Sequence, residues 1–153
     1  MKKIRNNSGI EKYLNKPKTF KVLGLSITPK PLKLRWKLLT ANITERVRRF
    51  TIQEAGLTQE ESNDTAYTGL LQVYENLFFS LSHKPKNEPS GVDNLVEILT
   101  ACASEDIDWY KFIKDKLKGK TPDKQLEIYN EIRTAGMAIY KDFFTEILTL
   151  RKM

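Results

Sequence analysis

Hydrophobic residues in this chain follow two different periods, and the change between them comes early. Phe20–Ile27 alternates between apolar and polar positions and is rich in strand-forming residues, with Gly24 in its middle. This pattern predicts a short strand or tight hairpin within residues 19–28. Pro29 and Pro31 end it, because proline has no N–H to donate to a neighbouring strand.

From Leu34 onward the apolar positions recur every three or four residues, which is the spacing of one face of an α-helix. We therefore predict a mainly α fold, in which a short N-terminal strand or β-hairpin is followed by a bundle of about five helices. The predicted apolar faces are Trp36, Leu39, Ile43, Val47 and Phe50; Ala66, Leu70, Val73, Tyr74, Leu77 and Leu81, widened by Leu71 and Phe78; Val92, Leu95, Val96, Leu99, Cys102 and Ala103; Tyr110, Ile113 and Leu117; and Leu126, Tyr129, Ile132, Gly136, Tyr140, Phe143, Ile147 and Leu150.

Residue types typical of helix ends separate these segments. Ser90, with Asp93 three residues later, has the spacing of a capping box. Gly136, inside the last segment, costs about 1 kcal/mol relative to alanine and indicates a bend or a close helix contact. The other predicted ends are Gly56 and Gly119 as C-terminal caps, and Ser62, Asn63 or Asp64, Asp106 or Asp108, and Thr121-Pro122 as helix starts.

Composition sets the size of the folded unit. The chain has 153 residues, of which 40% are hydrophobic, so it can bury a core of its own as one domain. Residues 1–18 carry many Lys and Asn with little apolar periodicity, and we predict a flexible basic arm there. Residues 19–153 are predicted to form a single helical domain.

Charge is distributed unevenly along the chain. Residues 1–50 hold 14 Lys and Arg against two acids, a net charge of +12. Residues 51–153 hold 12 Lys and Arg against 17 acids, a net charge of −5, which together give the overall +7. A partner with a negative surface is therefore expected to bind the first third of the chain.

Catalysis has little support in the residue types present. The single histidine, His83, lies in a predicted turn and is expected to be solvated, and the single cysteine, Cys102, lies on an apolar helix face and is expected to be buried. One of each cannot build an ordinary zinc site. Glu127 and Glu131 lie one helical turn apart, but the Glu-x-x-His motif of helical-bundle metal sites is missing. We predict no enzyme activity, no catalytic residue, no metal site and no cofactor.

The cysteine count and the N-terminal sequence indicate the cellular compartment. A single cysteine allows no intramolecular disulfide, which is typical of a reducing cytoplasm. A basic N-terminus followed by Asn6-Asn7-Ser8-Gly9 lacks the apolar stretch of a signal peptide. No apolar run approaches the ~20 residues that cross a bilayer. We expect a cytoplasmic protein that does not enter a membrane.

A cationic rim surrounds the apolar face of the first predicted helix. Its long side chains can cover the edge of the core with their stems, or they can bind an acidic helix or phosphates. The predicted partner-binding residues are Arg35, Trp36, Lys37, Arg46, Arg48 and Arg49.

Residues Glu54–Glu61 resemble the turn of a phage-repressor type helix-turn-helix. In that family the Gly-Leu-Thr-Gln-Glu-Glu run opens the second helix, and leucine and alanine follow it. Here Ser62 and Asn63 stand at those positions. The resemblance implies nucleic-acid binding, with a helix that starts near Thr58.

A second resemblance covers more of the chain. Phe20–Ile27, then Lys30-Pro31-Leu32-Lys33-Leu34, then a helix resembles the opening of the small tail assembly chaperones of long-tailed bacteriophages, with Lys33 in place of the usual threonine. The long last helix, with Asp142-Phe143-Phe144, is similar to the ending of that family. The resemblance implies a protein without an active site that coats the long helical tape-measure protein before the tail tube polymerises around it.

Three functions follow as hypotheses. The first is a non-enzymatic phage or prophage protein resembling a tail assembly chaperone, whose partner is a long helical tail protein. The alternatives are a nucleic-acid-binding module that uses the basic N-terminal third, and a structural virion component. The sequence leaves open whether the protein forms a homo-oligomer.

Overall fold

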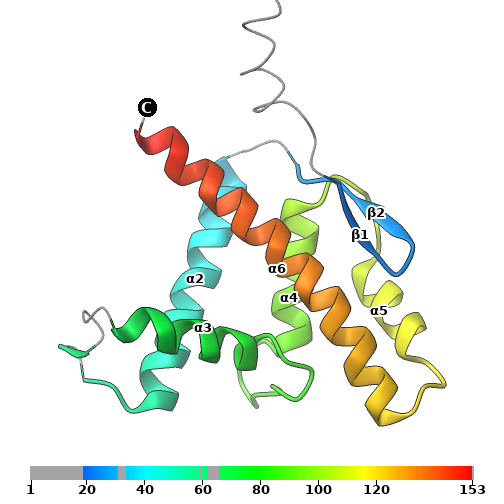
Figure 1. The fold of residues 1–153 in the computed structure, drawn as a ribbon, viewed down its shortest axis with the longest axis horizontal. Coiled ribbons are helices and arrows are strands. Elements are labelled where there is room, and N and C mark those ends of the chain that lie inside the picture. Colours follow the sequence, from blue (N-terminus) through cyan, green and yellow to red (C-terminus); the bar gives the residue numbers. More distant parts are fainter. Residues whose placement is uncertain (1–18, 31–33, 59, 62–65, 153) are drawn as a thin grey trace, which may run out of the picture.

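The computed structural model describes residues 19–30, 34–58, 60, 61 and 66–152, with backbone alone at 34–36, 40, 66, 68 and 143–152. Within these residues a two-stranded hairpin precedes five helices, which confirms the mainly α fold (Figure 1). The predicted basic arm of residues 1–18 lies outside the described residues. The elements are β1 (Phe20–Val22), β2 (Leu25–Ile27), α2 (Leu34–Ala55), α3 (Ala66–Phe78), α4 (Gly91–Cys102), α5 (Trp109–Leu117) and α6 (Pro122–Lys152).

The hairpin forms where the alternating pattern predicts it. β1 and β2 are antiparallel, with Phe20 opposite Ile27 and Val22 opposite Leu25. Leu23 and Gly24 form the two-residue turn, and both have positive φ, 48° and 83°. Two positive φ angles in succession define a turn that matches the right-handed twist of the strands, and Gly24 adopts its angle without strain.

After the hairpin the chain pairs with the end of α4. Pro29 bridges Ala103 in antiparallel sense, and the Lys30 N–H donates to the Cys102 carbonyl at 2.6 Å. The Lys30 Nζ donates to the Thr100 carbonyl at 2.7 Å. These bonds satisfy carbonyls that the end of a helix leaves without partners, and they place a cation at the negative end of its dipole.

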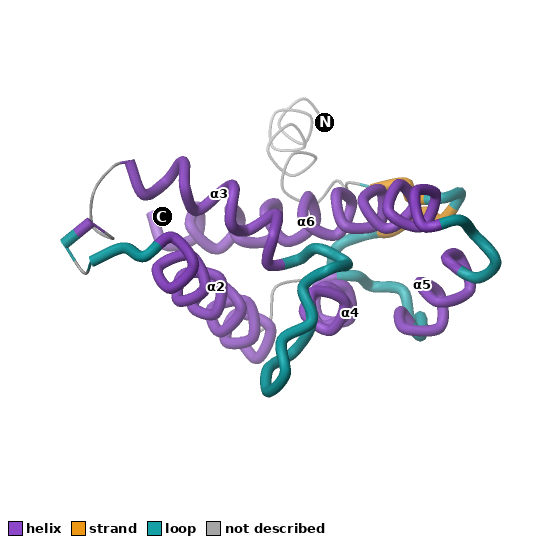
Figure 2. The backbone as a smooth tube through the Cα atoms, turned by 90° about the horizontal axis from the view of Figure 1, so that it is seen from below, coloured by secondary structure: helices purple, strands orange, loops and turns teal. Residues whose placement is uncertain are grey.

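Two layers of helices make up the body. Figures 1 and 2 together show α3 and α6 in one layer and α2, α4 and α5 in the other. α6 is the central element, because it contacts α4, α5, α2 and β1. The core lies between the layers and includes Leu95, Leu99, Tyr129, Ile132 and Ile139, each at most 1% exposed.

Gly136 of α6 packs closely against leucine side chains of α4. A Cβ atom at this position would lie 2.7 Å from Leu95 Cδ1 and 3.4 Å from Leu99 Cδ2. The prediction of a close helix contact at Gly136 is therefore confirmed.

The predicted capping box at the start of α4 is also present. Ser90 Oγ accepts a bond of 3.1 Å from the Asp93 N–H, and Asp93 Oδ2 accepts one of 2.9 Å from the Ser90 N–H. The Tyr110 hydroxyl donates to the other carboxylate oxygen of Asp93 at 2.8 Å. The Ser90 N–H and then the Tyr110 hydroxyl stabilise the ionised carboxylate and so lower the pKa of Asp93.

The remaining predicted helix ends have mixed outcomes. Asp108, not Asp106, caps α5, and Thr121 Oγ1 accepts from the Lys124 N–H at the start of α6. α2 ends at Ala55, and Gly56 follows it with a φ of 65°, as a C-terminal cap does. The candidate caps Ser62, Asn63 and Asp64 lie outside the described residues.

The segment that resembles a helix-turn-helix does not begin a described helix at Thr58. Thr58 and Glu61 bond each other reciprocally, at 3.0 and 3.2 Å, as the start of a helix would. The next described helix begins at Ala66. Residues 59 and 62–65, which stand between Thr58 and Ala66, lie outside the described residues, so the helix-turn-helix resemblance stays a hypothesis.

Candidate partner-binding surface

Clusters of metal-binding side chains and the single thiol are the first candidates for chemistry in this chain. Within residues 19–30, 34–58 and 66–152 no three His, Cys, Asp or Glu side chains lie close enough together to hold a metal ion. Cys102 is fully buried, as predicted, and burial raises its pKa to about 12. Since the thiolate is the reactive form of cysteine, this thiol is inert near neutral pH.

His83 is not the solvated loop residue that the sequence predicts. Its ring lies 4.9 Å from the Phe50 ring and 5.4 Å from the Phe78 ring, measured between centroids. Its Nε2 is buried and has no hydrogen-bond partner among the described residues. The prediction failed because the loop folds back onto α2 and α3, where the imidazole completes an aromatic cluster.

Arg46 joins two helices and is not a free member of the predicted cationic rim. Its Nη1 donates to Glu97 Oε2 at 2.8 Å and to Asn94 Oδ1 at 3.0 Å, both on α4. Asn94 is itself buried, at 1% exposure. Arg46 is therefore held in the contact between α2 and α4, a position that helical spacing alone could not reveal.

The other predicted rim residues have separate positions. Arg48 pairs with Glu45 on the same helix at 3.3 Å, and both side chains are largely exposed. Arg49 is exposed and forms no ion pair among the described residues, and Lys37 is half-buried. The side chains of Arg35 and Trp36 lie outside the described residues.

Charge reversal at Arg46 and at Arg49 is expected to change the free energy of unfolding by different amounts. Arg46→Glu places a carboxylate against Glu97 and removes the donor to the buried Asn94 oxygen, so we expect it to lower the free energy of unfolding by about 2 kcal/mol. Arg49→Glu, the matched control on the same helix, is expected to change it by less than about 0.5 kcal/mol. Urea unfolding followed by circular dichroism measures both. Equal losses in the two variants would contradict the inter-helix role of Arg46.

α3 presents apolar side chains to solvent as well as to the core. The inward face consists of Leu71, Tyr74 and Phe78, whereas Leu70, Val73 and Leu77 are 37%, 57% and 50% exposed. Only part of the predicted apolar face of this helix is therefore buried. Leu81 also falls outside the helix, because α3 ends at Phe78. We call Leu70, Val73 and Leu77 the α3 stripe.

One signal in the sequence points to this second apolar face. Leu70 and Leu71 are adjacent, as are Leu77 and Phe78, and neighbouring residues on a helix point about 100° apart. Apolar residues therefore cover more of the circumference of α3 than the core can bury.

The two edges of the α3 stripe have different neighbours. On one edge, Arg133 of α6 donates from Nη1 to Asn76 Oδ1 at 2.8 Å. On the other edge lies Tyr67, a half-buried residue. Burial is the largest influence and raises the pKa of Tyr67.

The fold and this surface define a class: a small helical protein with an N-terminal hairpin and an exposed apolar helix face. Comparison with protein-family models, with curated proteins and with solved structures gives no significant match. None of the described helices combines the length and the apolar character that crossing a membrane needs.

Proposed function

We propose that this protein binds helices without catalysing a reaction, in the manner of the phage tail assembly chaperones whose opening it resembles. Its client would be a long helical tape-measure protein, and it would cover helical segments of that client before the tail tube assembles. The observation that carries the proposal is the α3 stripe, an apolar face that a described helix leaves exposed.

The spacing of the stripe supports a helical client. Leu70, Val73 and Leu77 lie at positions i, i+3 and i+7, the pattern by which one helix packs along another. Contiguous exposed apolar side chains are typical of interaction sites, because water solvates them poorly. The stripe extends along α3, so it suits an elongated partner better than a small ligand.

The basic third of the chain supports a protein partner more than a nucleic acid. Nucleic-acid binding needs cations that are free to replace counterions on phosphates. Arg46 and Arg48 already contact the carboxylates of Glu97 and Glu45. Binding to DNA or RNA remains an outcome that the experiment below distinguishes.

Val73→Asp is expected to abolish co-purification with the long helical tail protein of the same phage or prophage when the two are expressed together. A carboxylate at the centre of the stripe would have to be desolvated on binding, which costs more than tenfold in affinity. Gln72→Asp is the matched control, because Gln72 is an exposed neighbour on α3 outside the stripe. Both variants should retain the helical circular dichroism signal of the unmodified protein.

Two results would contradict the proposal. Normal co-purification of the Val73→Asp variant would remove the α3 stripe from the binding site. Salt-dependent binding to DNA that Arg49→Glu weakens and Val73→Asp leaves unchanged would favour the nucleic-acid alternative. Recovery of the protein from mature virions would instead favour a structural virion component.

A further inference from the structure

Building on the proposed function, we propose that the helix that packs on the α3 stripe carries an acidic side chain that pairs with Arg133 of α6. The same helix approaches the backbone of α3 at Gly69. The stripe would then select amphipathic helices with an acidic edge, and Arg133 would be a residue that determines specificity.

Arg133 is a cation whose charge is not neutralised by the described residues. Its one described hydrogen bond goes to the neutral amide of Asn76, and no described carboxylate forms an ion pair with it. Its Nε is buried and has no described acceptor. A guanidinium presents five N–H groups in a fixed plane and matches a carboxylate with two parallel bonds, so such an acid is the best complement for this site.

Arg133 lies at the edge that a helix on the stripe would reach. It bonds Asn76, which is adjacent to Leu77 in sequence and three residues from Val73. Residues three or four apart are neighbours on a helix surface. α3 and α6 lie in the same layer, so one helix packed on α3 has α6 beside it (Figure 2).

Gly69 lies two helical turns before Asn76, on this same edge, and no described residue packs against the position of its missing side chain. A Cβ atom at Gly69 would meet no atom within 4 Å, whereas one at Gly136 would collide with Leu95. Gly69 is exposed in the first turn of α3, where glycine is less favourable than alanine by about 0.5–1 kcal/mol. Glycine at a helix contact permits a close approach of the partner backbone, which gives this unfavourable residue a use.

A second copy of this chain is a poor occupant for the stripe. None of the described exposed residues of α3 is acidic, and Glu75, which is on α3 but largely buried, pairs with Lys141 of α6 at 3.2 Å. Two α3 stripes packed against each other would therefore bring no α3 carboxylate to Arg133. The charge of the site fits a different chain with an acidic helix edge.

Two synthetic amphipathic peptides test the inference. Both carry leucines at i, i+3 and i+7, and the positions that flank this seam are glutamate in one peptide and glutamine in the other. We expect the glutamate peptide to bind about fivefold more tightly, the upper end for a partly exposed ion pair. Arg133→Gln should remove this preference and leave the affinity for the glutamine peptide unchanged, and Arg133→Lys should retain part of it. Fluorescence anisotropy at low ionic strength measures these affinities.

Gly69→Ala is an independent test of the same inference. The added methyl group should raise the melting temperature of the protein and lower its affinity for both peptides about threefold, so that stability and affinity change in opposite directions. Equal affinities of the two peptides for the unmodified protein would overturn the inference and leave the proposed function standing. Binding of neither peptide, or a dimer in light scattering that Val73→Asp dissociates, would overturn both.

Discussion

Replacing Gly91 with alanine is expected to lower the free energy of unfolding by about 3 kcal/mol or more, because backbone atoms occupy the space that a side chain would need. A Cβ atom at Gly91 would lie 2.1 Å from the Ser80 carbonyl oxygen and 3.0 Å from the Phe79 carbonyl carbon. Neither atom can move freely. The Ser80 carbonyl accepts from the His83 N–H at 3.2 Å, and the Phe79 carbonyl accepts from the Tyr129 hydroxyl at 2.9 Å.

Gly69→Ala is the matched control for Gly91→Ala, because both exchanges add one methyl group in the first turn of a helix. Gly69→Ala should raise the free energy of unfolding by about 0.5–1 kcal/mol, since its methyl group would enter open space and alanine favours the helix. The urea concentration at half-unfolding should therefore be lower for Gly91→Ala, and higher for Gly69→Ala, than for the unmodified protein. A loss below 1 kcal/mol in Gly91→Ala would show that residues 79 and 80 do not pack against the start of α4.

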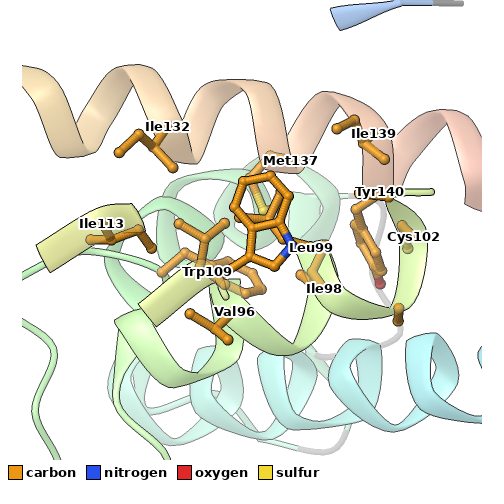
Figure 3. Packing of buried hydrophobic residues seen from close by; sticks show 14 of the residues in the cluster. Val96, Ile98, Leu99, Cys102, Trp109, Ile113, Ile132, Met137, Ile139 and Tyr140 are labelled. Carbon is orange, nitrogen blue, oxygen red and sulfur yellow. The ribbon is translucent and has the colours of Figure 1, made fainter. Parts of the chain in front are cut away.

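Replacing Trp109 with alanine is expected to lower the free energy of unfolding by about 3–5 kcal/mol, the range for removing a buried aromatic side chain. Trp109 is 1% exposed, and its indole is drawn amid residues of α4 and α6 in Figure 3. Its ring also meets the Phe112 ring edge-on, with centroids 5.6 Å apart. The substitution opens a cavity where three helices meet, so the melting temperature should fall by many degrees.

Two further variants define what Trp109 contributes. Its indole Nε1 is buried without a hydrogen-bond partner among the described residues. Trp109→Phe removes this unsatisfied donor, and the phenyl ring still fills most of the space that the indole occupied. We therefore expect the free energy of unfolding to fall by less than about 2 kcal/mol. Leu126→Ala on α6, where the side chain is 50% exposed, should cost less than about 0.5 kcal/mol. Equal losses for alanine at positions 109 and 126 would contradict the described core.

The hairpin and the helix ends could be predicted because each depends on residues that are close together in sequence. Ser90 and Asp93 cap α4 whatever lies beyond them, and Gly24 supplies a backbone angle that its own turn requires. Asp108 and Thr121 act in the same local way at the starts of α5 and α6. Such interactions involve one turn of chain and need no knowledge of the tertiary fold.

The surface proposed to bind a partner could be predicted only in part, because its residues come from different elements. Helical spacing grouped Arg46 with Arg49, but Glu97 and Asn94 of α4 hold Arg46 between two helices and leave Arg49 in solvent. Arg133 lies far from α3 in the sequence, and no local pattern connects it to Asn76. Charge counted along the chain therefore located a basic region but could not show which cations are already paired.

Sequence by itself determined the class of the fold and the positions of most elements, because hydrophobic periodicity and helix-capping residues are local properties. It also showed that the chain has too few histidines and cysteines for an ordinary zinc site. Tertiary structure decided which of the apolar side chains on α3 are buried. On α3 the apolar residues cover more than one face, and contact with α2 through Phe50 turns Phe78 inward and leaves Val73 in solvent. The surface proposed to bind a client thus arises because burial depends on what packs against a helix, whereas periodicity depends only on the helix itself.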